Sequence, residues 1–413
     1  MNPLADFVAV IPAGGAGKRL WPLSRAAQPK FLLDLTGVGR TLIQQAWDRL
    51  EPLAGANRVE VVTGAAHAAA VAAQLPGLDH STAAASTNEP SLVSQGLAAP
   101  ESDQRGDSSC RPSNGASRLG HRDNLLIEPG PKDSMPAIAL AAAIAQRRYG
   151  DVVVGSFAAD HIIDDQRAFA QAVEAAYLAA LEGFIATIGV KPTDPTTAYG
   201  YIKAGPSLGL VQAPQIKRVA AFKEKPDRAT AERYLADSDY RWNAGMFVFR
   251  ASLVAEQLRR LRPGLADGIG RMADAWDTDQ REAVAAAVWP GLERIAFDYA
   301  IAEPVAAEGG LATVPGDFGW SDLGDFASLA DLTAPDADGV TRLAQGSGPA
   351  PVALDSDGAV MVTADGRLVA LLGLPDAVVV DTPTAVLVSS RDRLQDVKAL
   401  VEHLEKSGLR DYL

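Results

Sequence analysis

Residues 7–30 constrain this chain more than any other part of its sequence. An apolar run at residues 7–11 leads directly into a glycine turn, GGAG, and three cations follow that turn: Lys18, Arg19 and Lys30. A turn of small residues lets backbone N–H groups approach an anion closely, and the cations supply charge to hold it. The segment therefore predicts a strand that ends in a phosphate-binding loop, and we expect the phosphate to belong to a nucleotide.

Two common glycine loops do not match this turn. A P-loop requires a glycine five positions before Gly17 and a Ser or Thr after the lysine, but the chain has Pro12 and Arg19 at these places. The dinucleotide fingerprint requires a third glycine where Leu20 stands. The loop is therefore a phosphate site of another kind.

Composition limits the partners of the chain. Its 413 residues suffice for two domains, and its formal net charge of −13 argues against a nucleic-acid or anionic membrane surface. Any phosphate site must then be a local basic pocket. A single cysteine, Cys110, excludes an intramolecular disulfide framework, and neither a signal peptide nor a membrane-spanning stretch is evident. We expect a cytoplasmic protein.

Strand-like and helix-like segments alternate through the first two-thirds of the chain. Strands are predicted at residues 7–11, 59–63, 125–128, 152–156 and 184–188. Helices are predicted between them at residues 41–53, 65–75, 137–149 and 167–181. This alternation is typical of a mainly parallel sheet covered by helices, so we predict a Rossmann-like α/β fold. The glycine loop then lies at the C-terminal edge of the first strand, where such sheets bind ligands.

Two stretches break this order. Residues 80–122 are rich in Ser, Ala, Asn, Gly and Pro and poor in large apolar residues, so they cannot bury enough surface to offset the entropy of ordering. We expect them to be a disordered insertion, without a catalytic role, in a catalytic domain of residues 1–330. Residues 331–350 are polar and rich in turn-forming residues, and they predict a linker.

The remaining residues, 351–413, predict a small β-rich C-terminal domain. Turn signals separate short strand-like pieces at residues 359–363, 368–372, 377–380 and 385–388. An amphipathic helix at residues 391–406 closes the chain. We expect this domain to serve packing or the formation of a homodimer.

A series of motifs resembles the sugar nucleotidyltransferases. The series begins with GGAGKRLWPLSR and the Pro29-Lys30 pair and continues in the family's order with PAIALAA, FAADHII, TIGVKPT, AYGYI, FKEKPD, WNAGMFVFR, FDYAIAE and FGWSDLGD. The resemblance covers roughly residues 7–330, and a weaker one continues beyond them. The LWPLSR, WNAGMF and WSDLGD segments are similar to the mannose-1-phosphate guanylyltransferase branch. That likeness implies transfer of GMP from GTP to mannose-1-phosphate with Mg²⁺, and a C-terminal domain that is a short left-handed β-helix.

Three alternatives remain beside this interpretation. A relative that transfers a uridylyl, thymidylyl or adenylyl group is the nearest, because base and sugar choice depend on a few hydrogen bonds. A non-catalytic regulatory relative would be expected to lose one of four charged residues that are all present: Arg19, Lys30, Asp160 and Asp322. A bifunctional form with a phosphomannose isomerase is disfavoured, because the segment after residue 330 is short for an added barrel and lacks clustered histidines.

The chemistry of nucleotidyl transfer indicates which residue types the site needs. Phosphate monoesters are already ionised near pH 7, so the difficulty lies in bringing two polyanions together rather than in removing a proton. The site should contain cations, a divalent metal and carboxylates that hold the metal. For the nucleotide we expect contacts from the loop and its cations: Ala13, Gly14, Gly15, Gly17, Lys18, Arg19 and Lys30.

The resemblance assigns the other roles. Asp160, which follows the predicted strand 152–156, and the distant Asp322 are the expected Mg²⁺ ligands. Lys225 is expected to contact the sugar phosphate. Glu224, Asn243 and Gly200 are expected at the hexose ring. Arg19, Lys30, Asp160 and Lys225 form the expected catalytic set.

Two departures from the family's pattern concern substrate contacts. Lys18 stands where a threonine is expected, and Lys132-Asp133-Ser134 replaces an Arg-Asn-Thr. The resemblance therefore does not indicate which substrate contacts these positions make. His161, beside Asp160, is expected to be structural.

Overall fold

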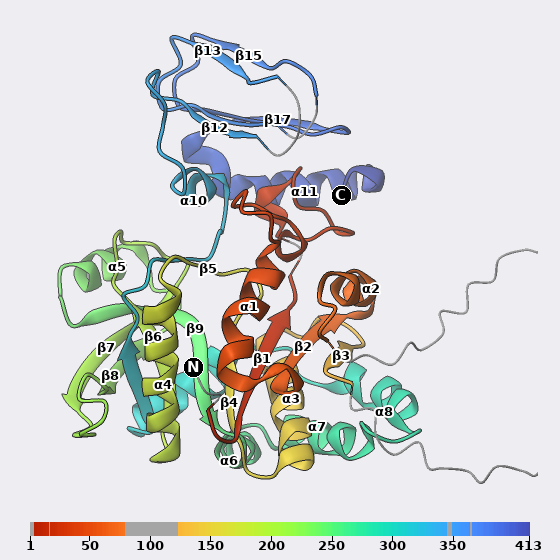
Figure 1. Ribbon diagram of the computed structural model, residues 1–413, viewed down its shortest axis with the longest axis vertical. Coiled ribbons are helices and arrows are strands. Elements are labelled where there is room, and N and C mark those ends of the chain that lie inside the picture. Colours follow the sequence, from red (N-terminus) through yellow and green to blue (C-terminus); the bar gives the residue numbers. More distant parts are fainter. Residues whose placement is uncertain (1–3, 16, 79–122, 345–348, 364–365) are drawn as a thin grey trace, which may run out of the picture.

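The computed structural model describes residues 4–15, 17–78, 123–344, 349–363 and 366–413, which form a larger α/β unit and a smaller C-terminal unit that stands on it (Figure 1). The insertion expected at residues 80–122 and Cys110 lie outside the described residues.

The larger unit is built on a mixed sheet in which nine described strands follow the order β3-β2-β1-β4-β9-β6-β10-β8-β7. Their bounds are β1 Phe7–Ala13, β2 Val59–Gly64, β3 Leu125–Glu128, β4 Val153–Ser156, β6 Ile185–Val190, β7 Gly200–Ser207, β8 Lys217–Lys223, β9 Tyr240–Arg250 and β10 Leu311–Pro315. The first four strands pair in parallel, as predicted. Strand β9 then runs antiparallel to both β4 and β6, and β6 and β10 pair in parallel again. The sheet is therefore mixed, with parallel pairs on both sides of β9.

Strand β1 separates two apolar cores because its side chains alternate between the faces of the sheet. Phe7 and Ile11 pack with α1 and α4 on one face, whereas Val8 and Val10 pack with α3, α6 and α7 on the other. The helices of this unit are α1 Leu42–Ala54, α2 Ala65–Gln74, α3 Ser134–Tyr149, α4 Gln166–Leu181, α5 Arg228–Leu235, α6 Ala251–Leu261, α7 Pro263–Ala275, α8 Arg281–Val288 and α9 Glu303–Ala307. A sheet covered on both faces explains why its central strands are continuously apolar.

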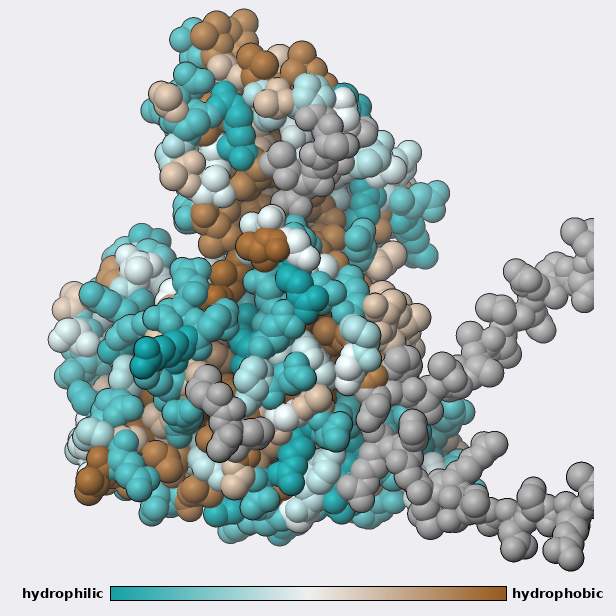
Figure 2. Space-filling model, in the orientation of Figure 1, coloured by the Kyte–Doolittle hydropathy of each residue, from teal (hydrophilic) through white to brown (hydrophobic). Residues whose placement is uncertain are grey.

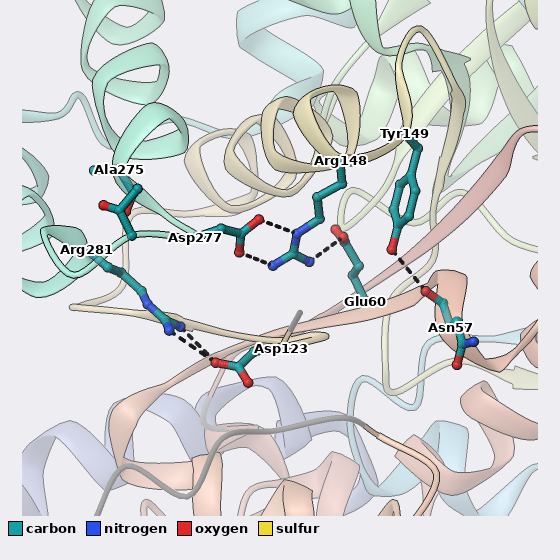
Figure 3. A network of polar contacts seen from close by, with 9 residues as sticks. Asn57, Glu60, Asp123, Arg148, Tyr149, Ala275, Asp277 and Arg281 are labelled. Atoms are coloured by element: carbon teal, nitrogen blue, oxygen red, sulfur yellow. Dashed lines mark hydrogen bonds and ion pairs between the residues drawn. The ribbon is translucent and has the colours of Figure 1, made fainter. Parts of the chain in front are cut away.

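Buried charges connect the end of α3 to the sheet (Figure 3). The Arg148 guanidinium donates to a carboxylate oxygen of Glu60 at 3.2 Å and to one of Asp277 at 2.7 Å. The Arg148 and Glu60 side chains are almost fully buried. Nearby, Arg281 at the start of α8 donates to Asp123 at 3.1 Å. These pairs hold α3, β2 and the α7–α8 connection together.

A short two-stranded sheet brings a distant segment to the end of β4. Strand β5 (Ile162–Ile163) pairs antiparallel with β11 (Trp320–Ser321). The pairing places residues just after β11 beside those just after β4. Helix α10 (Phe326–Ala330) follows and leads into the C-terminal unit.

The C-terminal unit is a coil of short strands that alternate between two small sheets. Strands β12 (Thr341–Ala344), β14 (Val360–Thr363), β16 (Ala377–Asp381) and β17 (Val386–Ser390) form one sheet, and β13 (Val352–Leu354) and β15 (Ala370–Leu372) form the other. Pairing is parallel along the coil and antiparallel only between β16 and β17. Strand β12 lies inside residues 331–350, which were expected to be a linker. It was not predicted because its pairing with β14 cannot be recognised from the local sequence.

Apolar side chains are exposed at the outer end of this unit, where Figure 2 shows them gathered. They include Val352, Leu354, Leu368 and Leu372 on and beside β13 and β15.

The two units share one apolar core. Figure 1 shows helix α11 (Val397–Lys406) lying over the N-terminal segment. Val397 and Val401 of this helix belong to the same buried apolar cluster as Leu20 and Trp21. The Trp21 indole N–H donates to the backbone oxygen of Tyr412 at 2.7 Å. The C-terminal unit is therefore packed directly on the segment that carries the glycine loop. None of the helices in the described part of the chain has both the length and the apolar character required to cross a membrane.

Candidate active site

The glycine loop borders a cavity of about 330 Å³ at the C-terminal edge of the sheet. Adjacent parallel strands β1 and β4 end at this edge, so their following loops meet there. The cavity is lined by Gly14, Gly15, Gly17, Lys18, Arg19, Leu20, Lys30, Asp160, Gly324 and Lys398. Ala13, the last residue of β1, is buried, and its backbone oxygen accepts a hydrogen bond from Thr63.

The loop requires glycine at two positions. Gly15 and Gly17 have φ angles of +92° and +57°, which favour glycine. A Cβ on Gly17 would also lie 2.7 Å from the Ser24 hydroxyl oxygen and 3.3 Å from the Lys30 side chain. Gly17 thus lets the Lys30 stem pass close to the loop.

Lys30 joins the ends of two distant segments. Its ammonium lies 2.9 Å from Oδ2 of Asp160 and donates to the backbone oxygen of Asp322 at 2.6 Å. Burial acts to raise the pKa of the Asp160 carboxyl, but Lys30 and His161 outweigh it, so this pKa lies below its usual value. Burial lowers the pKa of His161 to about 4, so this imidazole is neutral near pH 7.

Tyr199 holds the side chain of Asp322, a role that sequence reasoning missed. Its hydroxyl donates to Oδ1 of Asp322 at 2.7 Å. Its ring packs edge-on against Trp242 and Trp320, with centroid separations of 5.1 and 5.2 Å. Burial and the Asp322 carboxylate raise the pKa of this phenol, so it stays a donor. The AYGYI motif was a signal for this position, but only its glycine had drawn attention.

The donor set beside the cavity fits a hard divalent cation. Mg²⁺ takes oxygen ligands and often uses only one or two carboxylates together with water and substrate phosphates. Asp160 and Asp322 would supply such a pair, since Lys30 contacts the Asp160 carboxylate and the backbone oxygen of Asp322 and so links the two segments. Among the described residues, no group of three or more His, Cys, Asp and Glu could hold a metal ion by itself. An ion here would therefore depend on oxygens of the substrate.

Lys18 and Arg19 reach from the loop to the C-terminal unit. Arg19 donates to the Gln395 side chain at 2.9 Å, and the Lys18 ammonium lies 3.6 Å from a Glu405 carboxylate oxygen. Both residues still line the cavity. Their positions are therefore set partly by the C-terminal unit, a dependence that the sequence did not indicate.

A second polar cluster gathers the residues expected at the sugar. The Lys225 ammonium forms an ion pair with the buried Glu224, whose other oxygen, Oε2, has no hydrogen-bond partner within the described residues. Asn243 accepts from the Thr187 hydroxyl at 2.9 Å and donates to Asp298 at 2.6 Å. The cluster therefore brings together two carboxylates, an amide and an ammonium.

Gly200 makes room for Glu224. A Cβ at Gly200 would collide with Glu224 Oε2 and would lie 3.3 Å from the Asn243 Cβ. We had expected this glycine to allow a hexose ring to approach the backbone. The contacts show that it also makes room for the buried Glu224 carboxylate, which lies against the paired residues Gly200 of β7 and Asn243 of β9.

Asp298 was not recognised as a member of this cluster from the sequence. It opens the π-helical turn Asp298–Ala302 within the FDYAIAE segment. Burial, and then the nearby Glu224 carboxylate, raise its pKa to about 6. The sequence feature that could have indicated Asp298 is its place as an acidic residue in FDYAIAE, a motif used above only to identify the family.

The side chains of the unusual Lys132-Asp133-Ser134 segment form hydrogen bonds to other parts of the protein. Lys132 donates to the backbone oxygen of Leu292 at 2.7 Å, and Arg294 donates to Asp133 at 3.1 Å. The Ser134 hydroxyl accepts from the backbone N–H of Phe297 at 2.9 Å. This segment therefore positions the turn that carries Asp298.

The fold and the two clusters define an α/β protein with cations and carboxylates gathered at one sheet edge. The family model described as nucleotidyl transferase matches residues 8–339, and the model described as MannoseP isomerase/GMP-like beta-helix domain matches residues 350–404. The chain therefore belongs to the nucleotidyl transferase family, as its motifs predicted.

Particular relatives match nearly the whole chain. The xanthan biosynthesis protein XanB of Xanthomonas campestris is 37% identical over 98% of this chain and 74% of its own length. A mannose-1-phosphate guanylyltransferase of Escherichia coli K12 is 34% identical over 98% of this chain and 74% of its own length. A solved structure named mannose-1-phosphate geranyltransferase, from Thermus thermophilus, is 29% identical, has a TM-score of 0.75, and is matched over 97% of this chain and 99% of its own.

Proposed function

We propose that this protein transfers GMP from GTP to mannose-1-phosphate in the cytoplasm and gives GDP-mannose and pyrophosphate. The observation that carries the proposal is the position of Lys30, whose ammonium joins Asp160 to Asp322 beside the glycine loop. The relatives named mannose-1-phosphate guanylyltransferase, which match almost the entire chain, support the choice of sugar and base.

The reaction exchanges one phosphoanhydride bond for another. A phosphate oxygen of mannose-1-phosphate attacks the α-phosphorus of GTP, and the bond from that phosphorus to the bridging β-phosphate oxygen breaks. Pyrophosphate leaves with the electron pair. Because the attacking phosphate is already ionised, no side chain needs to remove a proton, and the protein must instead align and neutralise its substrates.

The residues divide this task between the two clusters. The loop amides at Gly14, Gly15 and Gly17, with Arg19 and Lys30, bind the triphosphate. Lys225 binds the phosphate of the sugar. Glu224 accepts hydrogen bonds from sugar hydroxyls. The Asn243 amide donates one hydrogen to Asp298, and its second hydrogen, which no other described residue accepts, can be donated to the sugar.

Asp160 and Asp322 would hold Mg²⁺, which when bound neutralises phosphate charge. Lys30 would keep both segments at that position, and Tyr199 would orient the Asp322 carboxylate.

The test is a matrix of nucleoside triphosphates against hexose-1-phosphates, scored by pyrophosphate release. We expect the highest kcat/KM for GTP with mannose-1-phosphate. A higher value for another pair would replace the proposed substrates by a different nucleotidyl transfer, and no turnover with any pair would favour a regulatory relative.

The metal site is tested separately with Asp160→Ala and Asp322→Ala. Each should abolish most turnover while the thermal midpoint of unfolding stays near that of the wild type. Near wild-type rates for either variant in saturating Mg²⁺ would contradict the two-aspartate site.

A further inference from the structure

Helix α11 of the C-terminal unit contributes a lysine to the cavity beside the glycine loop. Lys398, the second residue of this helix, lines the cavity together with Gly14, Gly15 and Lys30. It lies near the opposite end of the sequence from the loop, and neither a motif nor local composition had drawn attention to it.

The lysine is held in place by its neighbours in the helix. Val397 and Val401 are buried in the core that the two units share, where they pack with Leu20 and Trp21. The helix also packs against the short 3-10 helix Lys18–Leu20. Lys398 is itself exposed, so its charged end faces water rather than the core. A buried anchor beside an exposed cation orients that cation toward the cavity.

Charge in the cavity is unbalanced in a way that favours a polyanion. Four cations line it, Lys18, Arg19, Lys30 and Lys398, against one carboxylate, Asp160. Lys30 is paired with Asp160, and Lys18 lies near Glu405. Arg19 is bound to the neutral Gln395 side chain.

Lys398 differs from Lys18 and Lys30 because no carboxylate of the described residues pairs with it. An unpaired lysine at the mouth of a small cavity loses no ion pair when it binds a phosphate oxygen. The chain as a whole has a net charge of −13, whereas this cavity carries an excess of positive charge.

We propose that Lys398 binds the triphosphate of the nucleotide, so that the C-terminal unit completes the nucleotide site. The inference rests on the proposed function for the identity of the substrate. The unit that we had expected to serve packing or dimer formation then takes a direct part in substrate binding.

The test compares Lys398→Gln with Lys406→Gln, which removes the same charge from the exposed far end of the same helix. We expect Lys398→Gln to raise the KM for GTP by about tenfold, as for a lost charge-assisted contact, and to leave the KM for mannose-1-phosphate within about twofold. Lys398→Arg should recover most of the affinity, and Lys406→Gln should match the wild type. Unchanged thermal midpoints would confirm that the helix remains packed.

A second measurement separates this inference from the proposed function. Titration calorimetry with inorganic tripolyphosphate reports the phosphate contact without a base, a sugar or turnover. Weaker binding by Lys398→Gln alone would support the contact even if GTP and mannose-1-phosphate prove to be the wrong substrates. Equal binding by wild type, Lys398→Gln and Lys406→Gln, or an equal loss in both variants, would overturn it.

Discussion

The Tyr199 hydroxyl donates a 2.7 Å hydrogen bond to the Asp322 carboxylate, and the backbone oxygen of Tyr199 accepts from the N–H of Lys225 at 3.2 Å. One residue thus contacts both polar clusters. Since the two substrates must meet in line, a fixed residue between their sites helps to set the distance between them.

Tyr199→Phe should therefore weaken the proposed metal site without removing a proposed ligand. Loss of a hydrogen bond that orients a ligand typically costs about 10- to 100-fold in metal affinity. We expect the Mg²⁺ concentration for half-maximal activity to rise by about tenfold. Tyr177→Phe is the control, because it removes a hydroxyl hydrogen bond to Ala5 far from the site. Equal Mg²⁺ dependence in both variants would show that Tyr199 does not orient Asp322.

Lys225→Ala should affect the sugar phosphate more than the nucleotide. A lost charge-assisted contact costs on the order of 1.5–3 kcal/mol, so the KM for mannose-1-phosphate should rise by more than about tenfold while that for GTP changes little. Lys223→Ala removes an exposed lysine two residues away and should leave both constants unchanged. If GTP affinity falls instead, Lys225 belongs to the triphosphate site.

Gly200→Ala should act through Glu224. The added Cβ would collide with the buried carboxylate and force it to move, so we expect the KM for mannose-1-phosphate to rise by about tenfold. Gly264→Ala in α7 is a suitable control, because its Cβ would meet no atom within 4 Å. Steady-state kinetics of both variants measure this KM. An unchanged KM for the sugar phosphate in Gly200→Ala would show that Glu224 does not contact the sugar.

Sequence reasoning reached those parts of the fold and site that local patterns encode. Strands β1, β2, β3, β4 and β6 were predicted to within two residues because each is a continuous apolar run between turn signals. Strand β10, which pairs in parallel with β6, was not predicted. The loop and Asp160 were found because polar residues at the ends of adjacent parallel strands meet at one edge. The antiparallel strand β9, strand β12, and the positions of Tyr199 and Lys398 depend on pairing or packing between distant segments. Local apolar periodicity and turn residues do not encode such contacts, and only for Tyr199 did a motif, AYGYI, mark the position.

Arg148→Met should destabilise the protein strongly. The Arg148 guanidinium contacts the Glu60 carboxylate (Figure 3), and the two side chains are 1% and 0% exposed. The substitution leaves this buried carboxylate without its partner, at a cost of about 3–5 kcal/mol of unfolding free energy. The adjacent Arg147 pairs with Asp274 at the surface, so Arg147→Met should cost less than about 1 kcal/mol. Denaturant unfolding of both variants measures the difference, and similar losses would contradict a special role for the buried pair.

The same pair should make stability depend on pH. Burial raises the pKa of Glu60 to about 7, although Arg148 opposes the shift. A carboxyl with a raised folded-state pKa binds a proton in the native state where the unfolded chain has already lost it, so its contribution to stability is present at low pH and is lost as pH rises from about 4.5 to about 7. Glu60→Gln removes this ionisation and keeps the shape of the side chain. Denaturant unfolding of wild type and Glu60→Gln at pH 5 and pH 7.5 measures the effect. Between these pH values the wild type should lose about 1–3 kcal/mol of unfolding free energy relative to Glu60→Gln. A constant difference would mean that Arg148 holds Glu60 ionised throughout this range.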